Sequence, residues 1–598
     1  MPLAKNGGME SSMKNKNEII YVLKETWKYD KKVFIFMLAY TVCDFAIPYI
    51  YILLPYFVIN DYIERQQSVQ ILLGKTVIMI VGLLLLGYIK DYARKEFWPR
   101  VINVRKQFIH QLDDVVMRME YVKTENPQIL DKVEKASEAL ASNEQGVEGI
   151  LNRIFRVGGS LIGFLVYSYI VIKLSIVIHV WLLISGVLVY NLTRGFDKKK
   201  YDCYSELYSS GRKLKYLYNI SSEKKYAKEI RSYGLWTRIV GKRTVLMKER
   251  DAILNKLEGK KLCLVGIRAL DFLLKNIIIY AYIVYSVING TISLAEFTLY
   301  SSALLALSEA FGRILQSITE LKEQSRYVRD FMDFVQSNST SGENIIKNSK
   351  DYLVNNIRFQ DVSFIYPESS KKILDRVTFE IKKGEKIALV GKNGAGKTTL
   401  VKLLTGLYTS TEGDIFINNK PVQQYGEDYF KMFSVVFQES KILAFSIKEN
   451  IALNSNDGKD IEVKQVLDQV GLKRLYKNGI EVNMLKDLDE QGIELSGGEL
   501  QRFITARAIF KNAPIIVFDE PTAALDPIAE DKLYNNFASI TDGKIVIFIS
   551  HRLASTRFCD RIMFIDEGRI TEMGTHSELL ELNGNYAELF NKQAKYYV

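Results

Sequence analysis

The feature that most constrains this chain is a set of six apolar segments, all of which lie before residue 320. They run roughly over 33–59, 71–89, 154–172, 174–192, 271–288 and 294–314. An α-helix needs about 20 mainly apolar residues to cross the hydrocarbon core of a bilayer. Each segment is close to that length, so we expect six transmembrane helices rather than buried helices of a water-soluble fold.

The links between these segments alternate in length, and this indicates their side of the membrane. Three links are short, whereas 91–149 and 193–261 are long, charged and helix-like in periodicity, and the second is conspicuously basic. Because basic loops tend to stay in the cytoplasm, we place both long links and both termini there. Two independent soluble insertions are the alternative, but no Gly/Pro-rich boundary separates the links from the spans.

Composition argues against several other classes of protein. The net charge of +11 could indicate nucleic-acid binding, but the basic residues crowd into the links, so we attribute the charge to cytoplasmic loops and expect no nucleic-acid partner. The sequence has no CxxC pair, so neither a zinc site nor a disulfide framework is predicted. The four cysteines are scattered: Cys43, Cys203, Cys263 and Cys559. The polar start of the chain does not resemble a secretory signal.

The composition changes near residue 336, where a polar, low-complexity stretch indicates a linker. Beyond it, short β-rich runs alternate with helical runs, a pattern typical of an α/β domain with buried parallel strands. We therefore predict a multidomain membrane protein. Its expected parts are a cytoplasmic segment over 1–32, an all-α six-helix transmembrane domain over 33–335, a linker over 336–352 and an α/β domain over 353–598.

A phosphate-binding loop is predicted at residues 391–398, whose sequence GKNGAGKT matches G-x-x-x-x-G-K-[ST]. A strand-like run precedes it and a helix-like run follows, so backbone N–H groups and a helix N-terminus would face the phosphates. Lys397 is placed to reach the β- and γ-phosphates of ATP, and Thr398 to ligate Mg²⁺. The expected ATP-binding residues of this loop are Gly391, Asn393, Gly394, Ala395, Gly396, Lys397, Thr398 and Thr399.

Two adjacent acids follow the apolar run 515–518. At the end of a buried strand, Asp519 is placed to hold Mg²⁺ through water, and Glu520 to polarise the attacking water as a base or an orienter. A solvated turn is the other explanation for adjacent acids. The phosphate-binding loop upstream favours the catalytic interpretation.

The sequence LSGGE at residues 495–499, followed by Gln501 and Arg502, resembles the signature motif of ATP-binding cassette (ABC) transporters. Residues 353–598 resemble the nucleotide-binding domain of that family. Ser496, Gly497 and Gly498 begin a helix whose N–H groups form an anion site. The resemblance implies that this site closes on the ATP held by an opposite domain. One chain has one phosphate-binding loop and one signature, so two chains are needed.

Further positions match the family's motifs, and their roles are those that the resemblance implies. Tyr366 fits the aromatic residue that stacks on adenine, and Gln438 fits the glutamine that senses Mg²⁺ and the attacking water. Asp526 fits the loop that communicates across the dimer, and His551 fits the switch histidine on the γ-phosphate. The implied catalytic residues are Glu520, His551 and Gln438, and the implied Mg²⁺ ligands are Thr398, Gln438 and Asp519.

The signature departs from the family pattern at Glu499, where glutamine is usual. A carboxylate this close to phosphate would weaken ATP-driven closure unless its side chain points away. Ala523, where serine is frequent, is a milder change.

The first 320 residues resemble the six-helix exporter domain of the same family, through the segments 227–234 and 289–297. The resemblance implies short coupling helices near 119–127 and 216–224. Polar residues inside spans are costly and tend to face cavities, so Asp44, Asp271 and Lys275 are candidates to line a cargo cavity. The alternative is an intramembrane ion pair or snorkelling. We expect Arg268 at the cytoplasmic interface.

The function that these features favour is ATP-driven export of a small peptide or another amphipathic molecule across the cytoplasmic membrane. A homodimer is expected because Glu520 and His551 are both present, and a heterodimer is the alternative. A lipid or multidrug exporter would have the same architecture. An ATP-gated channel or regulator and a soluble ATPase are other classes, disfavoured by the lack of an added regulatory domain and by the six spans. We expect no peptidase domain before the first span, so this chain would not cleave leader peptides.

Overall fold

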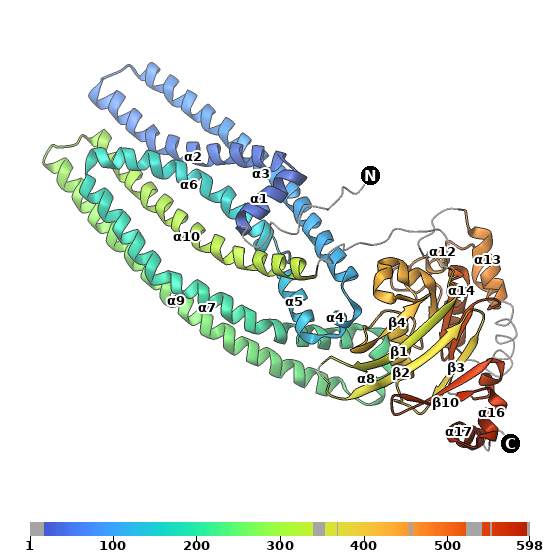
Figure 1. Cartoon of the computed structure of the whole chain (residues 1–598). Coiled ribbons are helices and arrows are strands. Elements are labelled where there is room, and N and C mark those ends of the chain that lie inside the picture. Colours follow the sequence, from blue (N-terminus) through green and yellow to red (C-terminus); the bar gives the residue numbers. More distant parts are fainter. Residues whose placement is uncertain are drawn as a thin grey trace. The chain divides into compact units, whose positions relative to one another are not determined.

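The computed structural model describes residues 17–338, 353–367, 369–453, 458–521, 541–550 and 553–594. The chain forms two compact units, shown in Figure 1. The helical unit comprises residues 1–119 and 123–341, and the α/β unit comprises 120–122 and 342–598.

The described part of the helical unit consists of helices joined by short turns. The helices are α1 (Glu18–Tyr29), α2 (Lys32–Ile59), α3 (Val69–Arg118), α4 (Tyr121–Glu125, whose first two residues belong to the α/β unit), α5 (Pro127–Glu138), α6 (Gly146–Leu174), α7 (Ile176–Ser222), α8 (Ala227–Ser232), α9 (Trp236–Ile288) and α10 (Leu294–Asn338). The six expected apolar segments lie in α2, α3, α6, α7, α9 and α10, so the predicted all-α, six-helix pattern is confirmed.

Three helices in the described residues are long and apolar enough to cross a membrane: Lys32–Glu64 (α2 with its π-helical end), α3 and α6. A shorter apolar stretch, Ile176–Leu192, begins α7. At about 1.5 Å per residue, a 50-residue helix such as α3 is about 75 Å long, more than twice the thickness of a hydrocarbon core of about 30 Å. The long links are therefore largely continuations of the same helices.

Helices α6 and α7 are joined almost without a loop, as the sequence predicts. Ser175 is extended, with φ −164° and ψ 121°, and ends one helix while capping the next. Its side-chain oxygen accepts a hydrogen bond from the backbone N–H of Ile178, which satisfies one of the unpaired donors at the start of α7.

Short helices interrupt both long links, but one of them lies outside its expected range. In the first link, α4 falls inside the expected 119–127. In the second link, α7 continues to Ser222 and ends where Glu223 turns to extended backbone. The short elements are therefore Lys224–Tyr226 and α8, mostly beyond the predicted 216–224, because no proline stops α7 earlier.

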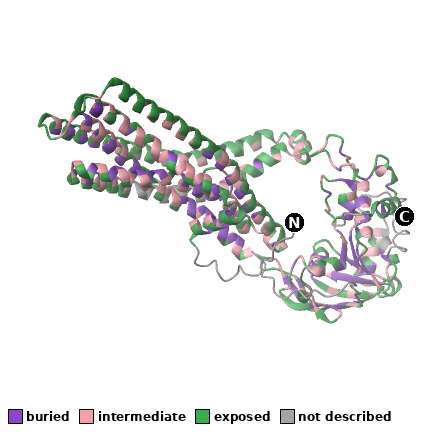
Figure 2. Ribbon diagram, turned by 90° about the horizontal axis from the view of Figure 1, so that it is seen from above, coloured by how far each residue is buried: buried purple, intermediate pink, exposed green. Residues whose placement is uncertain are grey.

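Many residues along the helices of the helical unit are exposed, as Figure 2 shows, and large apolar side chains are among them. Ile78 and Leu84 of α3 and Leu262 of α9 are 72%, 68% and 78% exposed. A water-soluble bundle would turn such residues inward. This surface is suited to lipid.

The α/β unit contains two sheets in its described residues. One is antiparallel, in the order β2-β1-β4-β5, and the other has the order β10-β9-β3-β8-β7-β6, parallel except for β10. The strands are β1 (Asn356–Ile365), β2 (Lys372–Lys382), β3 (Lys386–Gly391), β4 (Glu412–Ile417), β5 (Lys420–Pro421), β6 (Phe433–Val436), β7 (Ile515–Asp519), β8 (Ile545–Ile549), β9 (Arg561–Asp566) and β10 (Arg569–Gly574).

The order of the second sheet positions the functional site. Strand β8 lies between β3 and β7, with Leu389 and Asp519 both paired to Ile549. Since the strands are parallel, the carboxyl ends of β3 and β7 meet at one edge of the sheet, where ligands bind in open α/β folds. The described helices of this unit are α11 (Lys397–Leu404), α12 (Ile447–Ala452), α13 (Asp460–Gln469), α14 (Gly497–Lys511), α16 (His576–Glu581) and α17 (Asn585–Ala594).

Candidate functional site

The loop between β3 and α11, residues 391–398, has the strand–loop–helix context that the sequence predicts. Gly394 and Gly396 have φ values of 79° and 107°, which residues with a side chain rarely adopt. A Cβ atom on Gly391 would lie 2.1 Å from the carbonyl oxygen of Ile565, and one on Gly396 would lie 2.7 Å from Leu374. The glycines are therefore required for the curled backbone, whose N–H groups can face an anion.

Lys397 is held at the centre of this loop. Its side chain is buried, and Nζ donates hydrogen bonds to the carbonyl oxygens of Gly391 at 2.7 Å and Lys392 at 3.0 Å. Burial lowers the pKa of Lys397, and the nearby carboxylates of Glu520 and Asp519 oppose that shift. An anion arriving at the loop would stabilise this buried ammonium group.

Asp519 and Glu520 follow at the neighbouring end of β7. Asp519 is buried, and burial together with the charge of Glu520 raises its pKa to about 6, opposed by Lys397 and a hydrogen bond with Thr398. The Asp519 carboxylate, whose ionisation is unfavourable, lies next to a second carboxylate and a threonine hydroxyl, and this set of oxygen atoms is suited to a divalent cation. The residues present therefore fit Mg²⁺.

Gln438 lies beside Glu520, and the sequence predicts that both residues act on the attacking water. The Gln438 side chain donates from Nε2 to Oε2 of Glu520 at 3.0 Å. The backbone of Glu520 has a φ of 52°, and its N–H donates to the carbonyl of Ile549 at 3.0 Å. A non-glycine residue in this conformation is uncommon and is held by its surroundings.

Tyr366 is placed next to the phosphate-binding loop by its packing. Its hydroxyl forms a 2.9 Å hydrogen bond with the hydroxyl of Thr399. Its ring meets those of Phe364 and Tyr408 edge-on, with centroid distances of 5.0 Å and 5.4 Å. These contacts fix the ring plane of Tyr366 close to the start of α11.

The signature residues begin α14, and Glu499 is turned back onto the start of its own helix. Ser496 is the N-cap, and its N–H and hydroxyl donate to Glu499 Oε2 at 3.0 Å and 2.9 Å. Arg474 forms an ion pair with the other carboxylate oxygen and holds the pKa of Glu499 well below its usual range. The extra carboxylate is therefore neutralised within the chain, while Ser496 and Gly497 stay exposed.

The contacts of two further residues of the site, Gln501 and Arg474, do not follow from the sequence. Gln501 donates from Nε2 to the backbone carbonyl of Glu520 at 2.7 Å, which joins α14 to the end of β7. Arg474 lies 25 residues before Glu499, and no local pattern indicates their pairing. Asp526, His551 and Ala523 lie outside the described residues.

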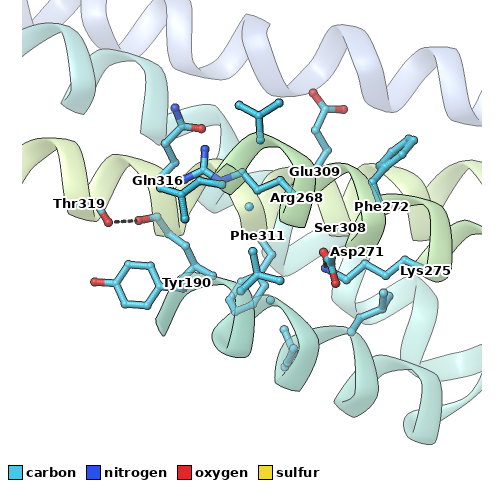
Figure 3. Close-up of a pocket in the computed structure, with 18 of the residues that line it drawn as sticks. Tyr190, Arg268, Asp271, Phe272, Lys275, Ser308, Glu309, Phe311, Gln316 and Thr319 are labelled. Atoms are coloured by element: carbon cyan, nitrogen blue, oxygen red, sulfur yellow. Dashed lines mark hydrogen bonds and ion pairs between the residues drawn. The ribbon is translucent and has the colours of Figure 1, made fainter. Parts of the chain in front are cut away.

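The three polar residues proposed to line a cargo cavity are separated by the structure. Asp271 and Lys275 of α9 line a cavity in the helical unit and also pair with each other, at 2.6 Å. Asp44 of α2 is absent from that lining and pairs instead with Lys90 of α3, at 2.9 Å. Arg268 is part of the cavity lining, which Figure 3 shows together with the Asp271–Lys275 pair.

Comparisons with known proteins agree with this architecture. Residues 374–523 match the family model described as ABC transporter. The chain is 26% identical to the subtilin transport ATP-binding protein SpaT of Bacillus subtilis, over 94% of this chain and 93% of that protein. It is 32% identical to the nisin transport ATP-binding protein NisT of Lactococcus lactis subsp. lactis, over 54% of this chain and 55% of that protein.

A solved structure shows the same fold. The ATP-bound structure of a bacterial Atm1-family ABC exporter matches with a TM-score of 0.76 and 20% identity, over 96% of this chain and 99% of that chain. The chain is thus an ABC transporter. More narrowly, it is an exporter-type half-transporter, a multi-pass membrane protein that binds ATP, couples its hydrolysis to export and works as a dimer.

Proposed function

We propose that this chain exports a small peptide or another amphipathic molecule across the cytoplasmic membrane, as a dimer of two copies. The observation that carries the proposal is its similarity, over nearly its whole length, to a protein named for subtilin transport. The basic second long link supports a cytoplasmic position for both termini and for the α/β unit.

The ATP site is proposed to form between the two copies. N–H groups of residues 391–398 and Lys397 would hold the phosphates, with the adenine against Tyr366. Ser496, Gly497 and Gly498 of the second copy would close on the γ-phosphate, and Asp526 and His551 would complete the site. Support comes from the buried ammonium of Lys397 and from the exposed start of α14, which leaves N–H groups available to an anion.

Thr398, Gln438 and Asp519 are proposed to hold Mg²⁺, with Asp519 acting through water. When bound, the ion would neutralise charge on the phosphate oxygens. The pKa of Asp519, raised to about 6 by burial and by Glu520, supports this proposal, because a cation would favour the ionised carboxylate.

Glu520 is proposed to orient the attacking water and accept its proton as the water oxygen bonds to the γ-phosphorus and the bond to the β-phosphate oxygen breaks. The hydrogen bond from Gln438 supports this role, because it fixes the direction of the carboxylate.

The test is ATP turnover and cargo uptake by the full-length protein in inside-out proteoliposomes. Glu520→Gln should lower ATP turnover roughly 100-fold while ATP still binds, and Glu581→Gln, an exposed carboxylate on α16, should leave it unchanged. Labelled nisin should accumulate against its gradient only with ATP. Turnover by Glu520→Gln at the wild-type rate contradicts the assignment of Glu520. Equilibration without accumulation would indicate a channel, and uptake of labelled phospholipid alone a lipid exporter.

A further inference from the structure

The helical unit contains a cavity between α7, α9 and α10 with a volume of about 890 Å³. Pockets that hold small molecules typically measure about 300–1,000 Å³, so a short peptide segment fits. Much of its wall is apolar and includes Leu182, Val265, Phe272, Ile279 and Phe311. On one side, α7 and α10 approach closely, since a Cβ atom on Gly186 would lie 2.6 Å from the Phe311 ring.

Charged residues also line this cavity, and nearly all of them are already partnered. The ion pairs are Asp271–Lys275, Glu258–Lys261, Glu309–Arg313 and Glu320–Arg153, at 2.6, 3.1, 3.1 and 3.0 Å, and Glu323 has an interaction of its own. Arg268 is the exception: no hydrogen bond or ion pair joins it to any residue in the described ranges. Arg268 is therefore the one cation without a partner among the described lining residues, which include three cations and five carboxylates.

The position of Arg268 makes this charge available to a ligand. Arg268 and Asp271 are three residues apart on α9, yet Asp271 is paired with Lys275 and leaves the guanidinium unengaged. Figure 3 shows the Arg268 side chain extending along the cavity in the direction of Gln316, on the α10 side. Arg268 is exposed, so its guanidinium group is accessible to a ligand that enters the cavity.

A guanidinium group matches a carboxylate in shape, because its planar fork can donate two parallel hydrogen bonds to the two oxygens. We propose that Arg268 binds a carboxylate of the exported molecule, which in a short apolar peptide is the C-terminus, while the apolar walls hold its side chains. This proposal rests on the proposed function, since it names the group by which the exported peptide is recognised.

The test uses a labelled hexapeptide, Leu-Ser-Phe-Val-Ser-Leu, as the free acid and as the C-terminal amide, with full-length protein in nanodiscs. Wild type should bind the acid at least about tenfold more tightly than the amide, as expected for a charge-assisted pair. Arg268→Gln should reduce this ratio to within about twofold. Arg268→Glu should reverse the preference toward an analogue that ends in an amine. Arg238→Gln, an exposed arginine on the same helix outside the cavity lining, should keep the wild-type ratio.

The outcomes separate this proposal from the proposed function. The circular dichroism spectrum and the gel-filtration profile of Arg268→Gln should match those of wild type, which shows that the variant is folded. If wild type exports peptide but binds acid and amide equally, or if Arg268→Gln keeps the preference, the role of Arg268 is wrong while peptide export stands. Failure to bind either peptide, or Arg268-dependent binding of a phosphate amphiphile alone, also overturns the proposal. If wild type shows no ATP-dependent uptake of any probe, the proposed function itself fails.

Discussion

The two units of this chain place their apolar residues in opposite ways. In the α/β unit, strands β7 and β8 are buried along their whole length, because burial removes apolar surface from water. In the helical unit, residues such as Ile78 and Leu262 are mostly exposed, because the surroundings are themselves apolar. Backbone hydrogen bonds within helices, close packing and paired charges then carry more of the stability.

The charged residues differ in the same way. In the α/β unit, Lys397, Asp519 and Glu520 are gathered at one sheet edge, where the pKa values of Lys397 and Asp519 are shifted. In the helical unit, charges within the apolar segments pair with each other, as Asp44 does with Lys90 and Asp271 with Lys275. Clustered ionisable groups with shifted pKa values indicate a catalytic site. In the helical unit, the paired charges distinguish Arg268, which has no partner among the described residues.

The largest expected effect concerns the charged residues at the sheet edge of the α/β unit. Lys397→Ala should weaken ATP binding by roughly 100-fold, because a charge-assisted contact to phosphate is lost. Lys383→Ala, at an exposed turn between β2 and β3, is the matched control. Binding of a fluorescent ATP analogue would measure this. Equal affinity in wild type and Lys397→Ala would show that the buried lysine serves only the loop itself.

The next effect tests the paired charges of the helical unit. Asp271→Asn should lower the free energy of unfolding by about 3 kcal/mol, because Lys275 keeps a buried charge with no counterion. Lys275→Met added to Asp271→Asn should restore part of the loss. Glu258→Gln, which breaks an exposed pair on the same helix, should cost less than about 1 kcal/mol. Reversible unfolding in mixed micelles would measure these values, and equal losses at both pairs would contradict the contrast between them.

Close packing between α7 and α10 is tested by Gly186→Val. The added side chain would meet the Phe311 ring, so we expect a loss of about 2 kcal/mol in unfolding free energy. Phe311→Ala in the same chain should recover part of that loss by making room. ATP affinity should not change. An unaltered melting temperature for Gly186→Val would mean that these helices separate readily at this point.

The smallest effect concerns the acid stability of the α14 cap. Because Arg474 lowers the pKa of Glu499 to about 2, ionised Glu499 stabilises the fold at pH values above its usual range near 4.5. That contribution is lost as the pH falls from about 4.5 toward 2. The melting temperature of wild type should exceed that of Glu499→Gln slightly at pH 6, and the difference should shrink by pH 3. A constant difference would show that the ion pair contributes nothing.

Much of the α/β unit could be predicted because its chemistry depends on local sequence. The glycines of 391–398, the strand before Asp519 and the cap at Ser496 each act within a few residues of their neighbours. By contrast, the Asp44–Lys90 and Arg474–Glu499 pairs join distant residues, and only packing decides such partners. The short coupling helix of the second long link was predicted too early, near 216–224, because α7 continues to Ser222 and the short helices follow it.

The hydrogen bond from Gln501 to the carbonyl of Glu520 has a consequence for the coupling between the two ATP sites of a dimer. In one chain, the signature at the start of α14 and the carboxylate of Glu520 would serve two different ATP molecules. A shift of Glu520 during hydrolysis of one ATP would displace α14, whose first residues would contact the other ATP. The two nucleotides should therefore turn over with cooperativity, and Gln501→Ala should bring the Hill coefficient for ATP closer to one.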